Sequence, residues 1–137
     1  MKAEQSSLYR QLELLHLWCL DTFENAPRNV TIQKDVQRIM DAVIDSAASV
    51  AIALQTENPM QRLEFLDVIV LRMTELKFLT KGLTEYSANT ARGKHVISKS
   101  QRTHLLDVMT QIGIELGRWR NATLKKIDKK KAATLSE

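Results

Sequence analysis

Basic side chains are the residues of this chain whose types and spacing point most clearly to a chemical task. Arg118, Lys125 and Lys129 follow one another at steps of seven and four, so one helix face presents all three. More basic residues lie beside them and upstream: Arg120, Lys126, Lys130 and Lys131, then Lys77 and Lys81 near Arg72, and Arg92, Lys94, Lys99 and Arg102. Such clusters bind phosphate backbones without sequence selectivity. A solvated helix face with a frayed tail is the alternative interpretation, and no sign of base stacking accompanies the lysine run.

Catalytic and metal-binding patterns are not recognisable in the sequence. His16, His95 and His104 have no second ligand at a known metal-site spacing. His104 and Asp107 lie one turn apart, which suits weak metal binding or an ordinary exposed helical pair. The chain has no Gly-rich phosphate loop and no nucleophile elbow. We therefore predict a protein that is not an enzyme, with no catalytic residues, no metal and no cofactor.

Charge is distributed unevenly along the 137 residues, whose net charge is +4. Residues 1–91 hold nine Lys/Arg and twelve Asp/Glu, giving −3, whereas residues 92–137 hold eleven and four, giving +7. A basic C-terminal third on a nearly neutral body predicts a polyanion or an acidic protein surface as partner.

Hydrophobic periodicity predicts four helices, at about 7–24, 31–57, 59–87 and 98–127. Thr31 is the expected N-cap of the second helix, Asn58 of the third, and Ser98 or Ser100 of the fourth. We expect residues 1–127 to form the folded unit and residues 128–137 to be a basic, flexible tail. The apolar stripes are Leu8, Leu12, Leu15, Cys19 and Phe23; Ile32, Val36, Ile39, Val43, Ala47, Val50 and Leu54; Leu63, Leu66, Val70, Met73, Leu76, Leu79 and Leu83; and Leu105, Met109, Ile112, Leu116 and Trp119.

Short connections between long helices favour an all-α, up-down-up-down antiparallel four-helix bundle. The apolar faces of the second and third helices, widened by Val68, Ile69 and Phe78, exceed the needs of a thin core and predict self-association. Neither a bilayer-spanning stretch nor a signal peptide is present, and we read Cys19 as a small buried residue. These features predict a cytoplasmic protein that does not bind membranes.

Gly113 and Gly117 lie four residues apart in the fourth helix, where each costs about 1 kcal/mol relative to alanine. Close helix contact, within or between subunits, explains such a pair better than flexibility, and a surface notch for a partner is the alternative. Trp119 continues the apolar stripe, so we expect a core or interface anchor.

The segment Ile112-Gly113-Ile114-Glu115-Leu116-Gly117-Arg118-Trp119, together with Pro27-Arg28 and the Arg/Leu pattern of residues 62–79, resembles bundle proteins of the Avd type. These are accessory variability proteins of diversity-generating retroelements, and bundle proteins of rRNA intervening sequences are related to them. The resemblance covers about residues 27–126. Arg118 stands where a glycine is common, and the 87–99 connection is long for this family, which leaves the wider bundle family open.

The resemblance implies a homopentamer with a basic surface that associates with a reverse transcriptase and with RNA or DNA. The residues we assign to nucleic-acid binding are Lys77, Lys81, Arg118, Arg120, Lys125 and Lys126. An interaction scaffold of the rRNA intervening-sequence type, without a direct nucleic-acid role, is the alternative. A small enzyme or ligand binder is disfavoured because the stripes are apolar.

Overall fold

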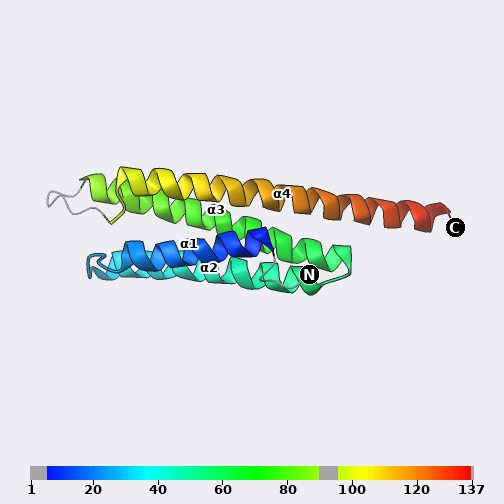
Figure 1. Ribbon diagram of the computed structural model, residues 1–137, viewed down its shortest axis with the longest axis horizontal. Coiled ribbons are helices and arrows are strands. Elements are labelled where there is room, and N and C mark those ends of the chain that lie inside the picture. The colour runs from blue at the N-terminus through cyan, green and yellow to red at the C-terminus, as the bar shows by residue number, and fades with distance from the viewer. Residues whose placement is uncertain (1–5, 90–95, 137) are drawn as a thin grey trace.

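A computed structural model describes residues 6–89 and 96–136 of the chain, and the described residues form four α-helices and no strand. The helices are α1 (Ser7–Phe23), α2 (Val30–Gln55), α3 (Pro59–Asn89) and α4 (Lys99–Ser136). They lie side by side along one long axis (Figure 1).

Each helix packs against its neighbours in the chain, and α4 closes the ring by packing against α1. Figure 1 shows the chain running along each helix in the direction opposite to the preceding one. The predicted all-helical, four-helix class is confirmed.

Side-chain caps fix where the helices begin. Asn58 Oδ1 accepts hydrogen bonds from the backbone N–H groups of Met60 at 2.9 Å and Gln61 at 3.2 Å, as predicted. Ser98 forms a capping box with Gln101, each side chain bonding the other's backbone N–H. The predicted cap at Thr31 is wrong, because Asn29 Oδ1 accepts from the Thr31 N–H and α2 begins at Val30.

The predicted apolar stripes form the core except at two positions on α3, of which Leu63 is only partly buried and lies outside the core cluster. All five α1 positions are buried, and the α4 stripe is buried from Leu105 to Leu116, with Trp119 partly buried against it. Val70 was expected in the core but is 41% exposed, whereas Ile69 beside it is fully buried. The face of α3 that is buried is therefore rotated about the helix axis from the predicted apolar stripe. This rotation is possible because α3 has apolar residues on both sides of that stripe.

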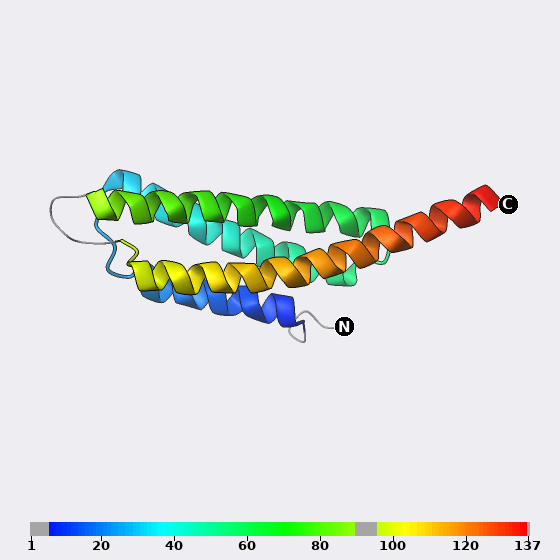
Figure 2. The same cartoon turned by 90° about the horizontal axis from the view of Figure 1, so that it is seen from above.

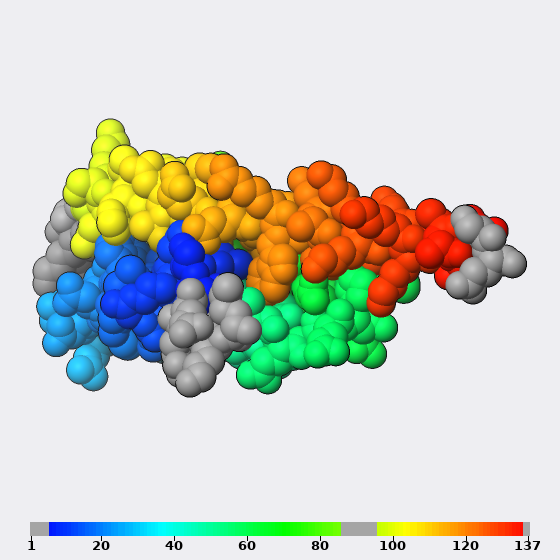
Figure 3. Space-filling view, turned by 45° about the vertical axis from the view of Figure 1, so that its right-hand side comes forward, coloured from blue at the N-terminus to red at the C-terminus, as the bar shows by residue number. Residues whose placement is uncertain are grey.

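Unequal helix lengths shape the molecule. At 1.5 Å per residue, the 38-residue α4 is about 57 Å long and the 17-residue α1 about 26 Å. The Ser7 hydroxyl and the Gln11 amide both donate to Glu115 Oε1, at 2.9 and 2.8 Å, so α1 begins level with the middle of α4. The C-terminal part of α4 therefore projects past the other helices (Figures 2 and 3).

The fourth helix was expected to end near Ile127, and this boundary is wrong. α4 continues to Ser136 because residues 128–136 contain no glycine or proline and include lysines, alanines and a leucine, which favour helix. Pro59, the first residue of α3, lies eight residues from Asp67, which pairs with Arg120 of α4. The bundle therefore ends at about residue 128 of α4, and we call residues 128–136 the overhang.

Gly113 and Gly117 are not packing residues within this bundle. A Cβ atom built on either glycine would meet no heavy atom within 4 Å, and Gly113 is exposed. The prediction of close helix contact inside the protomer is therefore wrong, because both positions lie beside the core-facing stripe of α4. A contact between subunits stays a prediction.

We expect Gly113→Ala and Gly117→Ala each to raise the free energy of unfolding by about 1 kcal/mol, because alanine restricts the unfolded chain and finds open space in the folded one. Urea denaturation measures the change. Gly82→Ala is the matched control, since its Cβ also meets open space, on α3. A loss of assembly in the α4 variants but not in Gly82→Ala would place the glycines at a subunit contact.

Candidate nucleic-acid interface

The outward face of α4 presents the predicted basic residues. Arg118, Lys125 and Lys129 are all exposed, and their spacing of seven and four places them on one side of the helix, away from the buried stripe. Lys126 is exposed as well. In the described part of the chain none of these four side chains forms an ion pair, so their charges remain available to a polyanion.

Arg120 differs from the other predicted residues because its charge is already paired. Its Nε lies 2.9 Å from Asp67 Oδ1 of α3, and the side chain is 38% exposed. A partner phosphate would have to compete with this carboxylate. We therefore read Arg120 mainly as a link between α3 and α4, which the sequence did not reveal.

Lys77 and Lys81 lie on α3 and form a separate basic group. Both are exposed, and Lys81 Nζ approaches Glu85 Oε1 at 3.9 Å. Lys77 is ten residues along α3 from Asp67, in the direction away from the overhang, whereas Lys125 is five residues beyond Arg120 towards it. At 1.5 Å per residue the two levels are about 22 Å apart. Lys77 and Lys125 therefore lie at different levels of the bundle.

Trp119 is partly buried against the core cluster. It anchors α4 to the bundle, as predicted, and is not an exposed platform on which a base could stack.

The interior of the bundle holds no polar cluster among the described residues that suggests catalysis or ligand binding. The buried hydroxyls of Ser46, Thr80, Thr84 and Thr123 each donate to a carbonyl one turn earlier in their own helix, at 2.8–2.9 Å. No group of three or more His, Cys, Asp or Glu side chains suited to a metal is present in the described ranges. The His104 ring lies 5.9 Å from the Trp18 ring, so it packs on an aromatic side chain between α1 and α4.

Cys19 is fully buried in the core, as predicted. Loss of solvation raises the pKa of its thiol to about 12, because burial penalises the thiolate. At neutral pH this thiol is protonated, unreactive and packed as a small apolar side chain.

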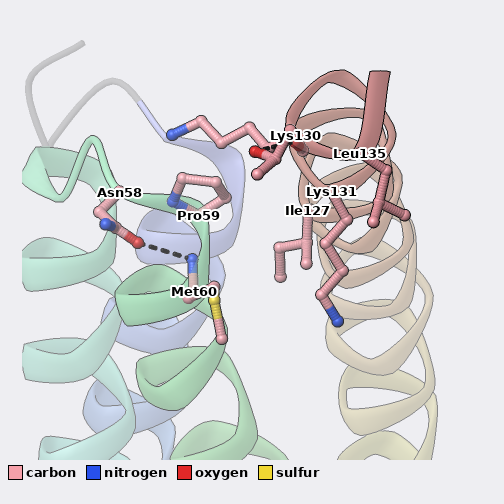
Figure 4. Close-up of a pocket in the computed structure, with 8 residues that line it drawn as sticks. Asn58, Pro59, Met60, Ile127, Lys130, Lys131 and Leu135 are labelled. Atoms are coloured by element: carbon pink, nitrogen blue, oxygen red, sulfur yellow. Dashed lines mark hydrogen bonds between the residues drawn. The ribbon is translucent and has the colours of Figure 1, made fainter. Parts of the chain in front are cut away.

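A cleft that the sequence did not reveal lies between the start of α3 and the overhang (Figure 4). Its volume is about 430 Å³. Apolar side chains line both walls, and two lysines extend beside them. The lining residues are Asn58, Pro59, Met60, Ile127, Lys130, Lys131, Thr134 and Leu135. Met60 and Ile127 are 67 positions apart in the chain, so no local pattern indicates that they share a cleft.

No family model, no curated protein and no solved structure matches the chain in the comparisons. The resemblance to Avd-type proteins therefore stays a hypothesis that depends on the residues named above. Within the described ranges, none of the helices has the length and apolar character needed to cross a bilayer. Arg92 and Lys94, two of the basic residues singled out in the sequence, lie outside the described residues.

We expect the Cys19 thiol to resist alkylation by iodoacetamide at pH 8 in the folded protein. The thiolate attacks the reagent, and a pKa near 12 leaves little of it, in a core that the reagent does not reach. Mass spectrometry over time measures the labelling, and the same reaction in denaturing urea is the control. Equally fast labelling in both conditions would contradict the buried position.

Proposed function

We propose that this protein is a non-enzymatic accessory subunit of a diversity-generating retroelement that binds its reverse transcriptase and nucleic acid. The observation that carries the proposal is the exposed, unpaired basic face of α4. Arg118, Lys125, Lys126 and Lys129 are exposed, and none of them forms an ion pair in the described part of the chain. The resemblance of residues 112–119 to Avd-type proteins supplies the partners, a reverse transcriptase and template RNA or cDNA.

Stabilisation of the helix terminus does not account for all of these lysines. Cations favour the C-terminal end of a helix through its dipole, but the effect falls off within the last turn. Lys125, Lys126 and Lys129 lie more than one turn before Ser136. Their concentration on an exposed helix favours binding of an external polyanion.

Exposed apolar side chains support self-association, which would repeat the basic face around an assembly. Phe78 is 78% exposed and Leu71, seven residues earlier on the same face of α3, is 60% exposed. Leu14, Leu17 and Leu20 on the outer face of α1 are exposed as well. We propose a homopentamer on the family resemblance, and repeated basic faces would then add their weak contacts through avidity.

We expect the Arg118→Glu, Lys125→Glu and Lys126→Glu triple variant to lose RNA binding while keeping its helicity. Six units of charge change on the outward face of α4, where counterion release would supply the affinity. Fluorescence anisotropy with labelled RNA across a salt series measures the binding, and circular dichroism the helicity. Wild-type binding should fall steeply with salt.

The matched control reverses three exposed basic residues of another region, Arg28, Lys34 and Arg38, and thereby makes the same change in net charge. It should weaken binding less than the α4 variant. Lys77→Glu with Lys81→Glu tests the separate α3 group. Equal losses in the α4 variant and the control would mean that net charge, and not the α4 face, determines binding.

Light scattering at micromolar concentration should give a mass several times the 15.6 kDa of one chain. Leu71→Gln with Phe78→Gln should lower that mass, because the double change removes apolar area from the exposed face of α3 without touching the core. Val30→Gln is a control at another exposed position, at the start of α2. A stable wild-type monomer would contradict self-association.

An interaction scaffold with no direct nucleic-acid role is the second candidate, and the apolar cleft beside the overhang favours it. The RNA titration separates the two functions. If the wild-type protein does not bind RNA even at low salt, the scaffold function is favoured, with an acidic protein surface as the ligand of the basic face.

A further inference from the structure

We infer that the cleft between the start of α3 and the overhang of α4 is a docking site for an acidic, amphipathic helix of a partner protein. The inference rests on the geometry and charge of the cleft and goes beyond the proposed nucleic-acid binding by the outward face of α4.

The walls of the cleft are apolar and unusually open to solvent. Met60 on α3 is 61% exposed and Leu135 on the overhang is 88% exposed, with the nearly buried Ile127 between bundle and overhang. Figure 4 shows the Met60 and Ile127 side chains on opposite sides of the gap, with Leu135 further along the overhang and further from Met60. Filling this gap would remove apolar surface from water on both walls.

Two lysines adjoin this apolar surface. Lys130 and Lys131 line the cleft, and Figure 4 shows their side chains extending in different directions, Lys130 over Pro59 and Lys131 back along the overhang. Neither forms an ion pair within the described part of the chain. The N-terminus of α3, capped by Asn58, adds the positive end of a helix dipole.

The combination of apolar walls with two lysines favours one class of ligand for the cleft over the others. A phosphate backbone would satisfy the lysines but would leave Met60 and Leu135 without an apolar partner. A flat anionic membrane would reach Leu135 at the tip of the overhang more readily than the recessed Ile127. A helix with an apolar stripe flanked by carboxylates fills the gap and pairs with both lysines, in the manner of helix-in-groove recognition.

The overhang also has regular secondary structure. It continues the α4 helix beyond the bundle, so its backbone is already helical next to the start of α3. Docking on such a preformed surface requires less ordering than docking on a frayed tail.

The test uses the full chain and a fluorescein-labelled acidic peptide whose leucines recur at i, i+3, i+4 and i+7 among glutamates. A scrambled peptide of the same composition has the same charge and no apolar stripe. We expect the amphipathic peptide to bind wild type at physiological salt and the scrambled peptide to bind roughly tenfold more weakly. Equal binding of the two peptides would overturn the inference, because charge alone would explain it.

Two variants address the two properties of the cleft. Leu135→Asp and the Lys130→Glu, Lys131→Glu pair should each weaken binding of the amphipathic peptide by roughly tenfold. Their matched controls are Leu71→Asp, at an exposed leucine on α3, and the Lys125→Glu, Lys126→Glu pair, which lies outside the cleft; both should weaken binding less. All of these side chains are exposed, and thermal melts verify that the variants fold.

Three further outcomes would overturn the inference. One is no peptide binding by wild type. Another is binding of anionic phosphatidylserine vesicles that depends on Leu135 while the peptide does not bind. The third is a lower oligomer mass for Leu135→Asp, which would show that the cleft holds a second copy of the chain. Loss of RNA binding in the Arg118, Lys125 and Lys126 variant with retained peptide binding would separate the two sites.

Discussion

The mismatch between the shortest and the longest helix controls how this bundle distributes its surfaces. All four helices can share a core only over the length of α1, which begins beside Glu115 through the Ser7 and Gln11 hydrogen bonds. Beyond that level α4 retains α3 as its neighbour, and the Arg120–Asp67 ion pair lies in this stretch. Past the start of α3 the overhang extends beyond the bundle, and its lysines and Leu135 are exposed to other molecules.

Features that depend on local spacing could be predicted from the sequence. The stripe from Leu8 to Phe23 repeats at three and four residues, and such a pattern buries the same face in any bundle. Asn58-Pro59 and the Ser98–Gln101 capping box are equally local. α3 is apolar on more than one face, so periodicity alone did not distinguish Val70, which is exposed, from Ile69, which is buried.

Features that depend on the register between helices could not be predicted in this way. Lys77 and Lys125 each belong to a basic cluster in the sequence. The Arg120–Asp67 ion pair fixes the register of α3 and α4 and places the two lysines about 22 Å apart along the bundle. The same limit applies to Gly113 and Gly117. Their spacing indicates a shared helix face but does not reveal that the neighbouring helix leaves this face open.

Two basic surfaces of different composition lie on α4. On the outward face, Arg118, Lys125 and Lys129 present exposed charge, which suits a solvated phosphate backbone. On the face towards α3, Lys130 and Lys131 adjoin Ile127 and Met60, so a ligand there gains both ion pairing and removal of apolar surface from water. The proposed function, in which the chain would hold a nucleic acid and an enzyme together, would need two such non-competing surfaces. Because both lie on the one continuous helix α4, their separation would be set by the helix and not by a linker.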